Sequence, residues 1–179
     1  MGRVTDESRE RVALLLPGRG YTVNHPVLYY VGEVARELGW VVEAVSWDGT
    51  DLSDREVIAL GRAALASLPA TGSVVVGKSL GSLLLPDAVA RNLPGVWLTP
   101  LLHRVAVRAG VLRGTGPSLL VGGTADESWD SATAHRSGHA VLELAGGDHG
   151  LQLAGDSVGS ARFLVTLVER TREFLAELD

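Results

Sequence analysis

Six short apolar segments recur along the chain, separated by stretches in which apolar residues repeat at helical spacing. The first, residues 12–16, is apolar at every position and ends at Pro17-Gly18. A short continuous apolar run bounded by such a turn is typical of a strand that is buried on both faces of a sheet. We therefore predict β-strands over residues 12–16, 40–45, 72–76, 95–99, 118–121 and 140–144.

The stretches between these strands predict helices. Residues 26–38 carry apolar side chains on one face, begin with a proline and are closed by Gly39, which is the usual asymmetry of helix ends. Ser53 and Glu56 form a capping-box pattern that begins a second helix. Pro86 should kink the helix that contains it. Further helices are predicted over residues 79–91, 100–110 and 156–178, and a loop with one helical turn over 126–137.

The alternation of strands and helices at short spacing predicts the fold class. It is typical of an α/β protein in which helices cover both faces of a parallel sheet. We therefore expect a three-layer, doubly wound sheet of about six parallel strands. The length of 179 residues suits a single domain over residues 11–179, with residues 1–10 as a flexible N-terminal tail.

Composition narrows the classes of function. The net charge of −5 provides no basic surface for nucleic acid. No apolar run approaches the roughly 18 residues of a membrane span, and no secretory segment opens the chain, so we expect a cytoplasmic protein. The absence of cysteine excludes disulfides, thiol catalysis and cysteine-based zinc sites. No other cluster has the spacing of metal ligands, so we expect neither a metal nor a cofactor.

Candidate chemistry is concentrated where the third predicted strand ends. There the chain reads Gly77-Lys78-Ser79-Leu80-Gly81 between a valine-rich strand and a predicted helix. A strand, a sharp turn that carries a serine and then a helix form the context of a nucleophile elbow. The two glycines avoid a Cβ that would press on the neighbouring strand or helix. The amide of Leu80 is then free to donate to an oxyanion.

Residues 72–79 also match the phosphate-binding loop pattern G-x-x-x-x-G-K-[ST]. That pattern requires residues 73–76 to curl into a nest of backbone amides after a preceding strand. Here the three valines at 74–76 have the character of the strand itself. Nucleotide binding through Gly72 to Ser79 is therefore the less favoured alternative.

Two further polar loops follow later strands. Asp126 follows the fifth predicted strand and His149 the sixth, each within a glycine-rich loop. In open α/β sheets the active site lies at the carboxyl ends of the strands. A serine nucleophile needs an imidazole to accept its proton and a carboxylate to orient that imidazole. Ser79, His149 and Asp126 supply these groups, with Asp130 and Asp148 as alternative acids.

Three loop motifs, at residues 77–81, 122–126 and 147–150, together resemble those of the α/β-hydrolase superfamily. The resemblance is to small serine hydrolases without a cap domain, of the dienelactone-hydrolase-like kind, and it covers roughly residues 12–178. It implies a minimal α/β-hydrolase fold with sheet order 2-1-3-4-5-6. The chain departs from many relatives in having Pro17-Gly18 in place of His-Gly and Ser82 in place of glycine.

The resemblance also implies roles for individual residues. It makes Ser79, Asp126 and His149 the catalytic triad. It assigns the oxyanion hole to the amide of Leu80 and to an amide near Arg19 or Gly20.

Residues near these loops are candidates for the substrate pocket, namely Tyr21, His25, Lys78 and Leu101. For His25, a role as the N-terminal cap of the helix that begins at Pro26 is favoured over a place in the pocket.

The expected function is that of a serine hydrolase that cleaves small to medium acyl esters or thioesters through an acyl-enzyme. With few residues left for a lid, its pocket should be shallow and open. We expect a monomer or homodimer whose partner is a small-molecule acyl substrate, not nucleic acid or a membrane. The alternative from another class is a catalytically silent scaffold that acts as a binding protein.

Overall fold

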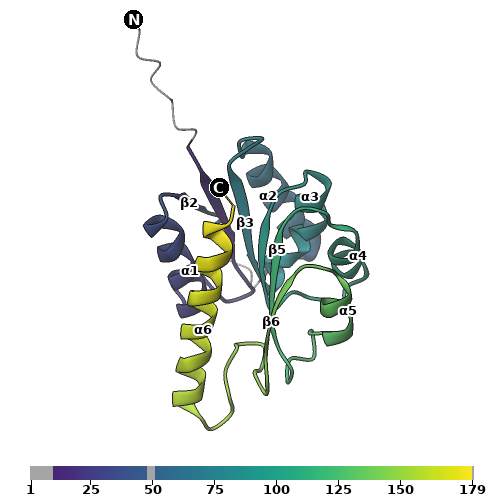
Figure 1. The fold of residues 1–179 in the computed structure, drawn as a ribbon. Coiled ribbons are helices and arrows are strands. Elements are labelled where there is room, and N and C mark those ends of the chain that lie inside the picture. The colour runs from purple at the N-terminus through teal and green to yellow at the C-terminus, as the bar shows by residue number, and fades with distance from the viewer. Residues whose placement is uncertain (1–9, 48–50, 179) are drawn as a thin grey trace, which may run out of the picture.

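The computed structural model describes residues 10–47 and 51–178 (Figure 1). The predicted tail therefore lies outside the described residues, except for Glu10. Six strands form one parallel sheet in the order β2-β1-β3-β4-β5-β6, which confirms the expected topology. The strands are β1 Val12–Leu16, β2 Val41–Ala44, β3 Ser73–Lys78, β4 Gly95–Leu98, β5 Ser118–Gly123 and β6 Ala140–Leu144.

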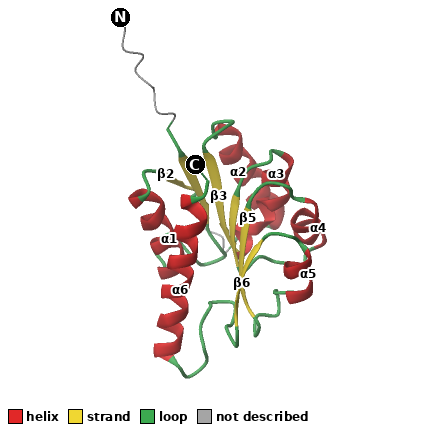
Figure 2. Ribbon diagram, viewed as in Figure 1, coloured by secondary structure: helices red, strands yellow, loops and turns green. Residues whose placement is uncertain are grey.

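Helices cover both faces of this sheet, as predicted (Figure 2). Helices α1 and α6 lie on one face, and α2 to α5 lie on the other (Figure 1). No helix within the described part of the chain is long and apolar enough to cross a membrane. The helical segments are α1 Pro26–Glu37, α2 Asp54–Ser67, the 3-10 helix η1 Ser79–Leu84, α3 Leu85–Ala90, α4 Val105–Arg113, α5 Ser131–Arg136 and α6 Ser157–Ala176.

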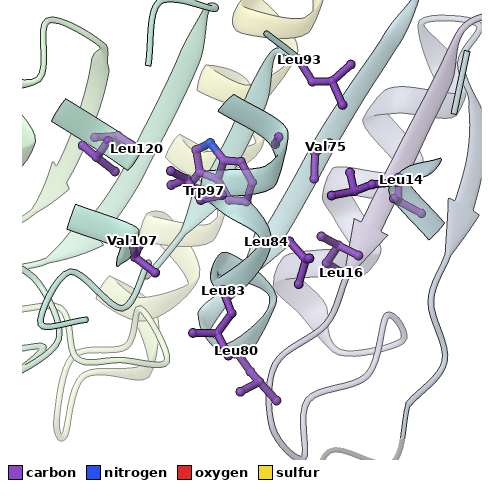
Figure 3. Close-up of a cluster of buried hydrophobic side chains, with 14 of the residues drawn as sticks. Leu14, Leu16, Val75, Leu80, Leu83, Leu84, Leu93, Trp97, Val107 and Leu120 are labelled. Carbon is purple, nitrogen blue, oxygen red and sulfur yellow. The ribbon is translucent and has the colours of Figure 1, made fainter. Parts of the chain in front are cut away.

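The two sides of the sheet bury separate hydrophobic clusters, because successive side chains of a strand point to opposite faces. In β1, Leu14 and Leu16 belong to the cluster beneath α2 to α5, whereas Leu15 belongs to the cluster beneath α1 and α6. Figure 3 shows the first cluster, in which Trp97 of β4 lies among leucine side chains. The continuous apolar run of β1 therefore identified a central strand correctly.

Strand β3 overturns the phosphate-loop alternative. Its residues Ser73–Lys78 pair with β1 on one side and with β4 on the other. The backbone of this segment is thus extended and takes part in the sheet, so it cannot curl into a nest around a phosphate. The valine-rich run correctly indicated a strand, and the match of residues 72–79 to the phosphate-loop pattern is coincidental.

The elbow helix differs from the prediction. In place of one kinked helix over residues 79–91, a 3-10 helix is followed by the separate helix α3. Pro86 lies in the first turn of α3, where a backbone N–H has no partner within the helix and its loss costs little. The expected kink is therefore replaced by a change of helix type.

One other predicted boundary was wrong. The helix expected over residues 100–110 begins only at Val105 and ends at Arg113, and the ends of such a short helix are poorly fixed by local pattern. The short helical turn expected within residues 126–137 is present as α5, and the Asp130 carboxylate caps it by accepting from the amide of Thr133.

Candidate active site

Ser79 stands on a strained turn between β3 and η1. Its φ of 49° lies in the left-handed region, which a residue with a side chain seldom adopts. A Cβ at Gly77 would lie 2.7 Å from the ring of Trp97, and one at Gly81 would lie 2.2 Å from the carbonyl oxygen of Leu16. Both distances are far below a normal contact. The predicted reason for the two glycines is therefore correct, and the close packing forces the serine side chain outward.

The structure brings the three predicted polar side chains together. The hydroxyl of Ser79 donates to Nε2 of His149 at 2.7 Å. Nδ1–H of the same ring donates to Oδ2 of Asp126 at 2.8 Å. The ring nitrogens take these roles because the carboxylate can only accept a hydrogen bond, which leaves Nε2 as the acceptor for the serine.

Asp126 is enclosed by the loops that follow β5 and β6. Its side chain is only 2% exposed, and its second oxygen accepts from the amide of Ser128 at 2.8 Å. Burial by itself would raise the pKa of this carboxyl group. The hydrogen bonds from His149 and Ser128, together with the positive charge of Lys78, outweigh burial and hold the pKa below its usual value. Asp126 is thus an ionised partner for the imidazole.

The two alternative acids have other tasks. Asp130 caps α5 and forms an ion pair with Arg108. Asp148 folds back on its own loop, where one oxygen accepts from the amides of Gly150 and Gln152. Asp126 is therefore the carboxylate that contacts the imidazole.

We expect the pH dependence of stability to report this buried carboxylate. A group whose folded pKa is lowered stabilises the fold above its unfolded pKa, and that contribution is lost as pH falls through the folded value. The stability advantage of the wild type over Asp126→Asn should therefore be largest near neutral pH and should shrink below about pH 4. Urea unfolding at pH 7 and pH 3 would measure it. An advantage that is equal at both pH values would contradict this assignment.

The loop after β1 lies beside the serine, as the predicted oxyanion hole requires. A Cβ at Gly18 would lie 3.4 Å from that of Ser79, and the carbonyl of Gly18 accepts from the amide of Tyr21 in a tight turn. Gly20 has a φ of 60° and is exposed. The Arg19 side chain reaches away to the carbonyl of Leu52. The Arg19 guanidinium is thus engaged by Leu52 and Asp54.

Tyr21 and His25 form one wall of a cleft of about 330 Å³. Their rings are stacked with centroids 4.6 Å apart. His25 is the N-cap residue of α1, but its side chain makes no capping bond and its Nδ1 instead accepts from the amide of Thr22. The cleft continues along residues 150–152, directly after His149, and along α6. His25 therefore occupies the N-cap position without capping the helix through its side chain, and its ring lines this cleft.

The other two pocket candidates are placed differently. Lys78 is 2% exposed and lies beneath the site, so it does not line an open pocket. The amide of Leu101 donates to the hydroxyl of Ser82, and its side chain packs against the core. Ser82 in turn donates to the carbonyl of Ser79 at 2.6 Å. This bridging role of Ser82 was missed, although its replacement of a frequent glycine was the available signal.

Thr99, at the end of β4, was also missed by sequence reasoning. It is fully buried, and its φ of 43° is unusual for a β-branched residue. Its hydroxyl accepts from the ammonium of Lys78 at 2.6 Å. Nothing in the sequence around Thr99 marks it as part of the site, because the contact joins residues on different strands.

The sheet order, the flanking helices and the elbow define the α/β-hydrolase fold, and comparisons with solved structures agree. Est1E from Butyrivibrio proteoclasticus has a TM-score of 0.74 at 15% identity, covering 98% of this chain and 90% of that one. The esterase Pf2001 from Pyrococcus furiosus has a TM-score of 0.72 at 14% identity, covering 94% and 83%. A serine hydrolase without a lid from Xanthomonas campestris has a TM-score of 0.64 at 16% identity, covering 97% and 84%. No protein-family model and no curated protein matches the sequence.

Proposed function

We propose that the protein is a serine hydrolase that cleaves small to medium acyl esters or thioesters. One observation carries this proposal: the continuous hydrogen-bond chain from Ser79 through His149 to Asp126, at a strained elbow. An exposed serine in an ordinary turn needs neither the strain nor the buried carboxylate. The combination serves to activate a hydroxyl for nucleophilic attack.

The reaction proceeds by acyl transfer to the serine. Oγ of Ser79 attacks the carbonyl carbon while its proton passes to Nε2 of His149, and Asp126 stabilises the resulting imidazolium. The amide of Leu80 and an amide of residues 19–20 donate to the negatively charged oxygen of the tetrahedral intermediate. The imidazolium then protonates the departing alcohol or thiol. Water, deprotonated by the same ring, releases the acid from the acyl-enzyme.

The surroundings of the site favour a small substrate. The imidazole side chain of His149 is 43% exposed, so a substrate carbonyl can approach from solvent. The nearby cleft beside Tyr21 and His25, of about 330 Å³, has space for a short acyl or alcohol group. Proteins of similar fold include esterases, and one of them, Est1E, has been solved with ferulic acid bound. We propose that the protein acts without a cofactor, as a cytoplasmic monomer or homodimer.

Labelling with a fluorophosphonate probe tests the proposal. The wild type should be labelled on Ser79, and Ser79→Ala should not, because the probe reacts only with an activated serine. A series of p-nitrophenyl esters from acetate to decanoate would then show a preference for the shorter acyl chains. A folded wild type that is neither labelled nor active would overturn the hydrolase proposal and favour the silent scaffold.

A further inference from the structure

Lys78 is the chain's only lysine; every other basic side chain of the Lys and Arg type is arginine. It immediately precedes the nucleophile and is 2% exposed. A buried ammonium is costly unless it is hydrogen-bonded and faces negative charge or an aromatic ring. The single lysine thus lies where desolvation of its ammonium carries a large free-energy cost, which its contacts must offset.

The contacts of the ammonium join the end of β3 to three loops at the carboxyl edge of the sheet. Nζ donates to the hydroxyl of Thr99, after β4, at 2.6 Å, and to the main-chain carbonyl of His149, after β6, at 2.9 Å. It also lies 5.2 Å from the ring centroid of Tyr21, after β1. The lysine itself ends β3. No other group described above spans so many parts of the site.

The bond to His149 is made to the backbone of the residue whose ring accepts the serine proton. Asp126 and Ser79 hold the two nitrogens of that ring, but neither holds the backbone from which it projects. The loop has other supports on its far side, where Asp148 accepts from the amides of residues 150 and 152. Lys78 supplies the support that faces the nucleophile.

The arrangement of acceptors around Nζ favours lysine over arginine. Thr99 and the carbonyl of His149 are single acceptors that converge on one nitrogen, which suits a compact ammonium with three donors better than a planar guanidinium fork.

Burial lowers the pKa of the Lys78 ammonium to about 8, although the negative charges of Asp126 and Asp148 raise it. The group therefore carries its charge at neutral pH.

We propose that Lys78 is a positioning residue of the proposed hydrolase: its ammonium ties the backbone of His149 to Thr99 and so holds the imidazole in line with Ser79. This inference rests on the proposed function. Lys78 does not touch the reacting atoms. Its loss should lower the rate of proton transfer while leaving substrate binding nearly intact.

Lys78→Met keeps an unbranched side chain that is shorter by one atom, and it removes both hydrogen bonds. We expect kcat for ester hydrolysis to fall about 10- to 100-fold, with KM changed less than about 3-fold, because small displacements of catalytic groups cost that much. Arg62→Met is the matched control, since it removes a cation from the exposed ion pair with Asp87 and should leave both constants unchanged. Wild-type kcat in Lys78→Met would overturn the proposal.

A chemical rescue separates the ammonium from the space it fills. The chain has no cysteine, so Lys78→Cys carries a single thiol that can be alkylated in denaturant before refolding. Bromoethylamine rebuilds a lysine-like ammonium, and bromopropane builds a neutral side chain of similar length. We expect only the amine product to return kcat to within about 3-fold of a wild type taken through the same cycle. Equal activity of the two products would overturn the proposal.

If the variants fail to fold, a measurement on the unmodified protein tests the hydrogen bond from Lys78 to the backbone of His149. In protein labelled with ¹⁵N-lysine and ¹³C, the single Nζ signal should show slowly exchanging protons and a coupling across the hydrogen bond to the His149 carbonyl carbon. A rapidly exchanging ammonium without that coupling would overturn the proposal. This measurement needs no activity, so it distinguishes failure of the tie from failure of the hydrolase assignment, which fluorophosphonate labelling of the wild type reports.

Discussion

Replacing His149 by alanine is expected to lower kcat for ester hydrolysis about 10⁵- to 10⁶-fold. Without the ring, the Ser79 hydroxyl loses the group that accepts its proton, and the buried Asp126 loses the partner through which it acts. Steady-state kinetics with a short p-nitrophenyl ester would measure the loss. Fluorophosphonate labelling should fall with it, because labelling uses the same proton transfer.

Asp126→Asn supplies the companion measurement. It preserves the shape of the side chain but turns the ring toward the wrong tautomer, which should cost about 10⁴-fold in kcat. Because the three groups act as one unit, the double variant with His149→Ala should be scarcely worse than His149→Ala alone. Independent, multiplying losses would show that the two residues do not act together. A His149→Ala protein that keeps substantial activity would remove imidazole catalysis from the proposal.

Replacing Gly81 by alanine is expected to lower the stability strongly. The new Cβ would lie 2.2 Å from the carbonyl oxygen of Leu16, which belongs to the backbone of the central strand β1 and cannot turn aside. The elbow must shift to make room, and we expect a loss of more than about 3 kcal/mol in the free energy of unfolding. For a chain of this size, that corresponds to a fall of about 10 °C in Tm. Calorimetry would measure it.

Gly32→Ala is the matched control, since Gly32 is also buried but lies within α1. Its new Cβ would meet the end of the Leu15 side chain at 3.3 Å, and a flexible side chain can move by that amount. The helix also favours alanine over glycine, so the net change should stay within about 1 kcal/mol. Similar losses in the two variants would mean that the elbow is less tightly packed than its geometry indicates.

The fold was largely predictable because its signals are local. The apolar run of β1 and the capping box at Ser53 and Glu56 each depend on neighbours within a few residues. Topology then followed from the rule that alternating strands and helices build a parallel sheet. The errors lie where a local pattern was extended too far, as at Pro86, which lies in the first turn of a helix instead of kinking one.

In the candidate site, too, the residues that local sequence features mark were predictable, and the contacts between distant residues were not. Ser79, Asp126 and His149 could be singled out because each follows a strand, and parallel strands bring their carboxyl ends to one edge. The sequence favoured Asp126 over Asp130 and Asp148 without showing their contacts. The choice was decided by hydrogen bonds that occupy the other two carboxylates elsewhere.

What the sequence determined by itself is thus the architecture, the elbow and the order of the polar loops, because these depend on periodicity, on glycine spacing and on chain direction. What only the tertiary structure decided is the interior of the site. The sequence predicted Lys78 to be a pocket residue and predicted no role for Thr99. Their contact with each other and with the backbone of His149 joins residues 21 and 71 positions apart. No local pattern encodes these contacts, because they form only when the carboxyl ends of β3, β4 and β6 are brought to one edge of the folded sheet.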